Sequence, residues 1–334
     1  MMMTGIDSTG RTPAPPASPA TPRAGRWFAA LALAAIAAAG ASPAAPAAGP
    51  LRYRFKAGET LRYTLVQDQK QETRITGGEM TNSALQTVDM HWTVRGVDAA
   101  GVADMSQTID RIRWKLTTPG DSVSIDSADP NVPDSQGAAQ FMPLIRALAG
   151  AEFTFKMDPR GEMSDIQVPR KLLESIQEVN PGAAAGGMFS EEGLKNLIAQ
   201  SRLAFPQGPI DKGATWDNQS RVSQANVGTS IMDKHYTFQG PSASDPRIVT
   251  FTLKSDFKVE PAAGAVGAIK IDSYEGKGDY SFDAEAGRIV SSKVTERLQA
   301  TFTMKDPQTG QSREIRQVTQ TVNTMTLGGA GDAK

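Results

Sequence analysis

Residues 51–65 read Leu-Arg-Tyr-Arg-Phe-Lys-Ala-Gly-Glu-Thr-Leu-Arg-Tyr-Thr-Leu, and their pattern decides the fold class. Apolar side chains alternate with Arg or Thr in 51–55 and again in 61–65. Successive side chains of a strand point to opposite faces, so each run has one apolar and one polar face. Ala57-Gly58-Glu59 supplies a turn between the runs. We therefore predict a β-hairpin with one buried face and one solvated face.

The same alternation continues through much of the chain. Strands are predicted before residue 160 at 91–94, 102–114, 122–125 and 153–157. After residue 210 they are predicted at 215–222, 230–238, 247–260, 267–283, 288–304 and 312–325. Several of these exceed the usual strand length of about five or six residues. Long, half-exposed strands of this kind favour a broad, curved antiparallel sheet or a half-barrel.

The middle of the chain changes to helical spacing. Phe141, Leu144, Ile145 and Leu148 recur at i, i+3, i+4 and i+7, and a helix is predicted to end at Gly150. Two more helices are predicted at 169–179 and 190–198, flanking an Ala/Gly hinge at 182–187. The predicted class is α+β, with about three helices in the middle of the chain.

Two related β-rich halves are also suggested. Phe55-Lys-Ala-Gly58 resembles Ile210-Asp-Lys-Gly213, and the predicted halves are residues 49–205 and 206–326, followed by a disordered tail at 327–334. An internal duplication explains the resemblance. So does the reuse of the same turn chemistry by any chain rich in hairpins.

Residues 1–48 differ in composition from the rest of the chain. Arg23 and Arg26 precede an apolar run from Trp27 to Ala39, and small residues with A-x-A spacing follow at 44–48. This order is typical of a secretory signal peptide, with cleavage near Ala48. The apolar run is shorter than the roughly 20 residues that span a bilayer. We expect an exported protein, periplasmic or extracellular, with an uncleaved N-terminal membrane anchor as the alternative.

Composition excludes several kinds of chemistry. The chain has 334 residues and no Cys, which rules out disulfides, thiolate metal sites and a cysteine nucleophile. A formal charge of -1 argues against a broad nucleic-acid surface. The sequence also lacks a Gly-x-Ser-x-Gly elbow, a phosphate loop and a His-Glu-x-x-His motif.

The remaining candidate residues have ordinary structural interpretations. The two histidines, His91 and His235, are expected to pack or to lie on the surface. A loop with four aspartates could form a weak divalent-cation site, or be a solvated loop: Asp121, Asp126, Asp129 and Asp134. Glu191 and Glu192 are expected to stabilise a helix N-terminus, and are a less natural choice for a glycosidase pair. No catalytic, cofactor-binding or metal-ligating residue is predicted.

Two scattered residue sets leave alternatives open. Methionines recur through the predicted strands and helices, and either fill the core or line a cavity for an apolar ligand: Met80, Met90, Met105, Met142, Met157, Met163, Met188 and Met232. Arginines alternate with apolar residues, and either form a solvated face or bind phosphate: Arg52, Arg54, Arg62, Arg111 and Arg113.

Two motifs carry a resemblance. Phe55-Lys-Ala-Gly58-Glu59-Thr-Leu-Arg-Tyr63 and Gly213-Ala-Thr-Trp216 resemble elements of a family of uncharacterised exported bacterial proteins, over most of 51–325. That family has no assigned activity. The predicted architecture also resembles periplasmic lipoprotein carriers, which fold as curved half-barrels with helices on the concave face. Fold does not imply function, so this second resemblance concerns architecture alone.

The function predicted from these observations is an exported, non-enzymatic protein with a binding or structural role at the cell envelope. Its partner would be an apolar ligand or an envelope protein, with no nucleic acid and no cofactor. A carrier of an apolar ligand or lipoprotein is the alternative, and a hydrolase with an unrecognised site is a third.

Overall fold

The computed structural model describes residues 50–75, 78–131, 136–179, 190–200, 203–224, 228–262, 268–305 and 312–328. The predicted leader at 1–48, the hinge at 182–187 and most of the predicted tail lie outside these ranges. The strands are β1 Thr60–Ile75, β2 Gly78–Val97, β3 Ala103–Thr118, β4 Asp121–Asp126, β5 Glu152–Met157, β6 Met163–Gln167, β7 Thr215–Gln224, β8 Gly228–Pro241, β9 Ile248–Pro261, β10 Ala268–Asp283, β11 Arg288–Lys305 and β12 Ser312–Leu327. The helices are α1 Gln136–Leu148, α2 Arg170–Val179 and α3 Glu191–Gln200.

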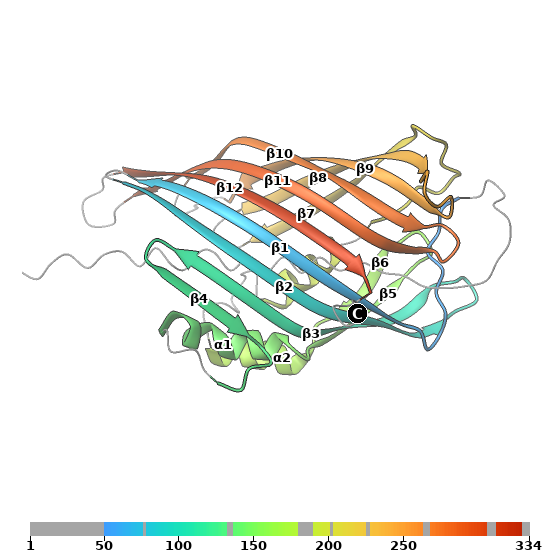
Figure 1. The fold of residues 1–334 in the computed structure, drawn as a ribbon, viewed down its shortest axis with the longest axis horizontal. Helices are drawn as coiled ribbons and strands as arrows, with labels where there is room; N and C mark the ends of the chain where they lie inside the picture. Colours follow the sequence, from blue (N-terminus) through green and yellow to red (C-terminus); the bar gives the residue numbers. More distant parts are fainter. Residues whose placement is uncertain are drawn as a thin grey trace, which may run out of the picture. The chain divides into compact units, whose positions relative to one another are not determined.

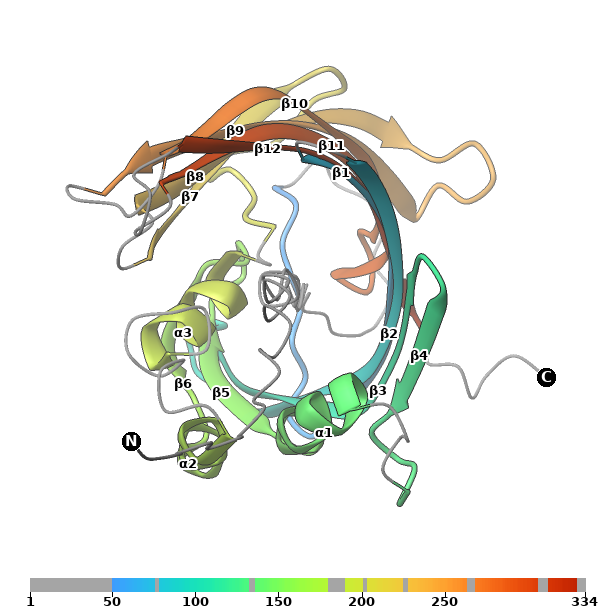
Figure 2. The ribbon, with the colours of Figure 1, turned by 90° about the vertical axis from the view of Figure 1, so that its left-hand side faces the viewer.

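All described strands belong to one sheet. Its order is β6-β5-β3-β2-β1-β12-β11-β10-β9-β8-β7, with β4 paired to β3 off this path, and every pairing is antiparallel. The long strands β1, β2, β10, β11 and β12 run side by side (Figure 1). Figure 2 shows the sheet curving as an open surface. The prediction of a long, curved antiparallel sheet is confirmed. The predicted α+β class gives too much weight to the helices, because the structure is mostly sheet with three short helices among the described residues.

The central pairing joins the two ends of the chain. β1 pairs with β12 over a register that runs from Tyr63 opposite Leu327 to Arg74 opposite Arg316. Strands β1–β6 therefore lie on one side of this pairing and β7–β12 on the other. The boundary between two halves, and their origin by duplication, stay predictions.

The opening stretch of the sequence folds differently from the expected hairpin. Residues 51–55 form no strand, although β1 begins at Thr60 as the second run predicts. The Tyr53 amide donates to the carbonyl of Pro159, and the Arg54 amide donates to the carbonyl of Gly287. The prediction was wrong because these backbone groups bond to two distant turns, which replace a neighbouring strand. Gly161 and Gly287 permit this close approach, since a Cβ at either would collide with Tyr53 or Arg54.

Helix α3 lies against both edge strands of the sheet, β6 and β7. The segment that follows it also connects the two edges. The Phe205 amide donates to the Arg160 carbonyl beside β6, and the Trp216 indole of β7 donates to the Ala204 carbonyl. The open side of the sheet is thus covered by α3 and residues 203–206, while α1 packs against α2 and β4.

Aromatic side chains form the core at this side of the sheet. Phe205 packs against Tyr53, Trp216, Phe251 and Phe282, with ring centroids 4.9–6.2 Å apart. Such contacts add to the area that each ring buries. Among the described residues, no helix has the length and apolar character needed to cross a membrane.

Candidate functional site: a polar belt on the inner face

We call inner the face of the sheet that carries Tyr63 and Leu65 of β1, and outer the opposite face. The register places one fully apolar row next to them, with Val88 of β2 and Met325 of β12 on either side of Leu65. All four side chains are buried, with at most 2% exposed. This row is part of the hydrophobic core, as alternation in 61–65 predicts.

The inner face becomes polar further along the same strands. Polar side chains occupy three consecutive inward positions on each of the neighbouring strands β1 and β12, and single inward positions on the strands beside them, although period-two alternation would place apolar residues there. We call this set the polar belt: Gln67, Gln69 and Gln71 of β1, Asn82 and Gln86 of β2, Ser255 of β9, Tyr274 of β10, Glu296 of β11, and Thr319, Thr321 and Asn323 of β12.

Glu296 is the charged residue of the belt. Tyr274 donates its hydroxyl to Glu296 Oε1 at 2.6 Å, and the Asn323 amide donates to Oε2 at 3.4 Å. The hydroxyls of Ser255 and Tyr274 lie 3.1 Å apart. Four strands thus contribute to one hydrogen-bonded group centred on a carboxylate.

A glycine makes room for this group. Gly276 lies inward on β10, opposite both Ser255 and Glu296. A Cβ at Gly276 would lie 2.0 Å from Ser255 Oγ and 2.6 Å from Tyr274 Oη. The tyrosine side chain therefore occupies the space above a residue without a side chain, as glycines inside strands often allow.

Tyr274 is held in its protonated form. Burial raises the pKa of the Tyr274 hydroxyl well above its ordinary value, and the neighbouring Glu296 carboxylate raises it further. The Tyr274 hydroxyl consequently stays a hydrogen-bond donor to Glu296.

Several belt atoms are buried without a partner. Gln71 Nε2, Asn82 Oδ1 and Asn323 Oδ1 have no hydrogen bond in the described part of the chain. Gln71 and Asn82 lie opposite each other on β1 and β2. Most buried polar groups in proteins are hydrogen-bonded, so unpaired ones ask for an explanation.

Beyond the belt, apolar side chains return at several inward positions next to the inward Thr73 and Gln317, and they are less covered than the core row. Phe302 of β11 lies opposite Ile269 and Ile315 on its two neighbours, and all three side chains are only half-buried. Leu298 is half-buried as well, and Ile75 near the end of β1 is 54% exposed. We call Ile75, Ile269, Leu298, Phe302 and Ile315 the apolar tip.

The two histidines lie on the outer face. His91 Nδ1 is 2.7 Å from Asp110 Oδ1, and Arg62 reaches the same aspartate at 3.7 Å. Asp110 is the extra residue of a β-bulge in β3 opposite Asp89 and Met90. His91, which was expected to pack or to lie on the surface, is 26% exposed in this arrangement.

His235 has a similar partner. Its Nδ1 lies 2.7 Å from Asp217 on β7, and its Nε2 lies 3.5 Å from Asp256 on β9. The hydrogen bond that His235 donates to Asp217 raises the pKa of His235 above its ordinary value. Both carboxylates are mostly exposed, at 73% and 66%, and the contacts described for either histidine include no hydroxyl nucleophile.

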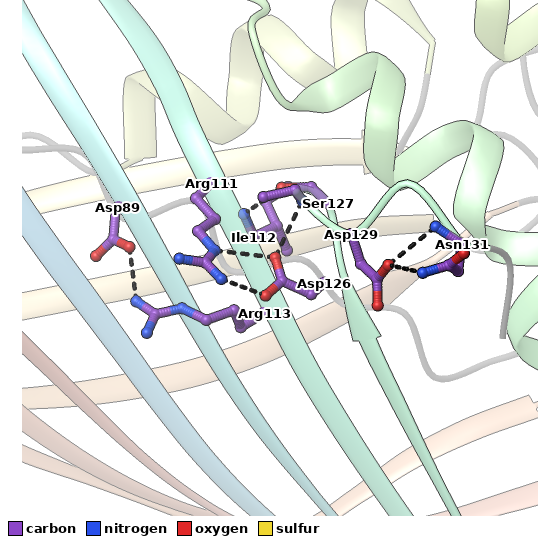
Figure 3. A network of polar contacts seen from close by, with 9 residues as sticks. Asp89, Arg111, Ile112, Arg113, Asp126, Ser127, Asp129 and Asn131 are labelled. Carbon is purple, nitrogen blue, oxygen red and sulfur yellow. Dashed lines mark hydrogen bonds and ion pairs between the residues drawn. The ribbon is translucent and has the colours of Figure 1, made fainter.

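The acidic loop is held by its own neighbours (Figure 3). Arg111 makes two hydrogen bonds to Asp126, at 2.9 and 2.5 Å, and holds the pKa of this carboxyl below its usual range. Asp129 accepts from both the backbone and the side-chain amide of Asn131. Asp121 accepts from the Ser122 amide, and Asp134 lies outside the described residues. Across the described ranges, no set of three His, Asp or Glu side chains is placed to hold a metal ion.

The other candidate residues have structural surroundings. Glu191 and Glu192 lie in the first turn of α3, where Ser190 Oγ accepts from the Gly193 amide. Four of the eight candidate methionines are fully buried: Met90, Met105, Met142 and Met157. Met80 is 37% exposed, Met163 and Met232 are half-buried, and Met188 is outside the described residues.

The arginines divide between two settings. Arg62, Arg111 and Arg113 lie on the outer face in ion pairs with aspartates. Arg52 donates to the carbonyls of Pro206 and Gln207, and Arg54 is exposed in the segment before β1.

Comparison with known proteins gives a family. A family described as "Family of unknown function (DUF6263)" matches residues 100–289, which is more than half of the chain. The chain belongs to this family. The matched region runs from just before β3 to the first residues of β11, and therefore includes Tyr274 but not Glu296. No curated protein matches the chain.

Solved structures with similar architecture are distant. The chain is similar to lipovitellin, from a structure titled "Lipid-protein interactions in lipovitellin", with 15% identity, a TM-score of 0.46, and coverage of 83% of this chain but only 26% of that one. It is also similar to an outer membrane channel from Pseudomonas putida F1, with 7% identity, a TM-score of 0.23, and coverage of 82% and 97%. The outer membrane protein OprD from Pseudomonas aeruginosa is 7% identical, with a TM-score of 0.23 and coverage of 81% of this chain and 94% of that one. At these TM-scores the likenesses carry no argument about function.

The polar belt was not predicted from the sequence. Gln67, Gln69 and Gln71 lie at inward positions of β1. The inward positions at the start of the same strand are apolar. A second signal was present in β10, in Tyr274-Glu-Gly276-Lys-Gly278-Asp-Tyr280. Its two glycines alternate in step with its two tyrosines, so all four residues lie on the same face of the strand. Which strands bring these residues together could not be read from either pattern.

Proposed function

We propose that this protein is exported from the cytoplasm and binds an apolar or amphiphilic ligand on the inner face of its sheet, without catalysing a reaction. Export is supported by the three-part leader at 1–48. The ligand would lie against the apolar tip and the polar belt.

The observation that carries this proposal is the order of side chains along the inner face. The buried core row is followed by a belt with unpaired amide atoms, and then by a half-buried apolar tip. A sheet with a purely structural role would continue its apolar row along β1 and β12. Buried polar atoms without partners cost about 1–3 kcal/mol each, and a bound ligand would offset that cost.

The histidines support a non-enzymatic role. Each has an aspartate partner, but both pairs lie on the solvated outer face, away from the belt. Catalytic acids and bases usually occupy sites where burial shifts their pKa values.

The proposal is tested by native mass spectrometry of the protein purified without detergent from the envelope of the expressing cell. We expect a bound species that carries an apolar chain and is released by organic solvent. A variant with two glutamates in the apolar tip, Leu298→Glu with Phe302→Glu, should lose it. Recovery of ligand-free protein under all conditions, with no binding of added alkyl compounds, would contradict the proposal.

A further inference from the structure

We infer that the polar belt recognises the head of an amphiphilic ligand and that this head is a primary ammonium group bound by Glu296. The inference rests on the proposed function and names the class of ligand. The apolar part of such a ligand would lie along Leu298 and Phe302, on the same strand as Glu296 and on the same face.

Glu296 lacks a counter-charge. Among the described residues, no Lys, Arg or His forms an ion pair with it. Lys234 of β8 lies inward in the same cross-strand row as Glu296. Ser255 of β9 and Gly276 of β10 lie between the two residues, so Lys234 is three strands away from Glu296. At strand spacings of 4.7–4.9 Å, this separation is about 14 Å. A half-buried carboxylate without a cation close by is costly.

The group around Glu296 has an excess of acceptors. An ionised carboxylate can accept about four hydrogen bonds, and Glu296 accepts two from the described residues, from Tyr274 and Asn323. Because Asn323 uses Nδ2 for this bond, its orientation is fixed, and its Oδ1 remains buried without a partner. Two neighbouring inward side chains therefore offer unused acceptor positions.

This chemistry selects among head groups. An ammonium has three donors, no acceptor and a positive charge, so it satisfies both unused acceptors and neutralises Glu296. An alcohol can donate one hydrogen bond and leaves the charge unpaired. A carboxylate or phosphate would add charge of the same sign next to Glu296 and is disfavoured.

The test uses three probes with the same chain and different heads: dodecylammonium and dodecanoate below their critical micelle concentrations, and dodecanol below its solubility limit. Binding to the purified protein is measured by isothermal titration calorimetry at pH 7. We expect dodecylammonium to bind at least tenfold more tightly than dodecanol at a stoichiometry of one, and dodecanoate to bind most weakly.

Variants locate the effect. Glu296→Gln keeps the shape of the side chain and removes its charge, so it should reduce the preference for the ammonium over the alcohol to less than threefold. Glu275→Gln is the matched control, because Glu275 is an exposed residue on the outer face of β10 that pairs with Lys277. It should keep the tenfold preference, which excludes general attraction of a cation to an acidic surface.

The outcomes separate the two proposals. Equal binding of the ammonium and the alcohol by the wild-type protein, or tighter binding of dodecanoate, overturns the ammonium inference and leaves the proposed function standing. Failure of all three probes to bind overturns the proposed function itself. The wild-type comparison does not depend on any variant, so it decides the matter even if Glu296→Gln fails to fold.

Discussion

On the outer face of the sheet, Asp89 lies 2.6 Å from Arg113 and Asp126 lies beside Arg111, whereas on the inner face Glu296 is bonded only to neutral groups among the described residues. The outer charges are partly exposed and are arranged in cross-strand pairs, a common pattern on solvated strands. The inner carboxylate is half-buried. The difference is that the inner carboxylate, unlike the outer ones, has no cationic side chain paired with it among the described residues.

The two faces should also differ in what they contribute to stability. Residues of the inner core row remove apolar surface from water, while exposed ion pairs contribute little. Substitutions at matched inner and outer positions test this comparison.

The largest effect is expected at Trp92, which lies inward on β2, is fully buried and packs edge-to-face on Phe155 at 5.1 Å. Trp92→Ala should lower the free energy of unfolding by about 3–5 kcal/mol, because it leaves a cavity in the core. Urea denaturation followed by circular dichroism measures the loss. The outward neighbour Thr93→Ala should change it by less than about 0.5 kcal/mol, and a similar loss for both would contradict the comparison.

A smaller loss is expected for Gly276→Ala, because the added Cβ would collide with Ser255 and Tyr274. Overpacking of this kind costs about 1–3 kcal/mol. The variant should also weaken dodecylammonium binding, since Tyr274 must move away from Glu296. Gly96→Ala is the control, because a Cβ at Gly96 meets nothing within 4 Å. Unchanged stability and binding in Gly276→Ala would show that Tyr274 has room to adjust.

Gln71→Met should stabilise the ligand-free protein. Gln71 is 4% exposed, and its Nε2 has no partner in the described residues. Removing an unpaired buried donor while keeping the side-chain length should raise the free energy of unfolding by about 1 kcal/mol. The same substitution at the exposed, outward Gln320 should have no measurable effect. A marked loss of stability in Gln71→Met would mean that this amide has a structural partner.

The smallest effect concerns His235 on the outer face. Its pKa is raised above the ordinary value of 6.5, chiefly by the hydrogen bond with Asp217. A raised pKa means that the charged form stabilises the fold fully below pH 6.5, and that this contribution is lost as the pH rises through the folded-state value. It should be small, because the histidine side chain is 45% exposed.

This shift can be measured by NMR titration of the imidazole, which is assignable because the chain has only two histidines. Asp217→Asn should move the His235 midpoint down towards 6.5. A midpoint that is already 6.5 or lower in the wild-type protein would show that the Asp217 contact does not persist in solution.

Much of the secondary structure could be predicted from the sequence. The strands at 215–222, 230–238 and 247–260 and the three helices are confirmed with small changes at their ends. In these elements the apolar residues recur with a clear period of two or 3.6, and this period depends only on the local backbone geometry. The first half of β2 and the short β6 were missed, since residues 78–90 and 163–167 are mostly polar or irregular in pattern.

The fate of 51–55 shows where local pattern stops being sufficient. This stretch alternates as clearly as 61–65, and yet only the second forms a strand. Backbone groups of the first are bonded to turns that lie about 100 and 230 residues away in the chain, near Pro159 and Gly287. A strand needs a partner, and alternation does not say whether one is available.

From local pattern alone, the sequence predicts a leader of the export type at 1–48, and it indicates the long strands and the three helices that the structure shows. Charge order, apolar run length and side-chain period are local properties, so they can be read without the fold. Only the tertiary structure decided that β1 pairs with β12 and that Tyr274, Glu296 and Asn323 meet on one face. Strand order and register depend on pairing between residues far apart in the chain, and a single-residue change of register would turn every belt side chain to the other face.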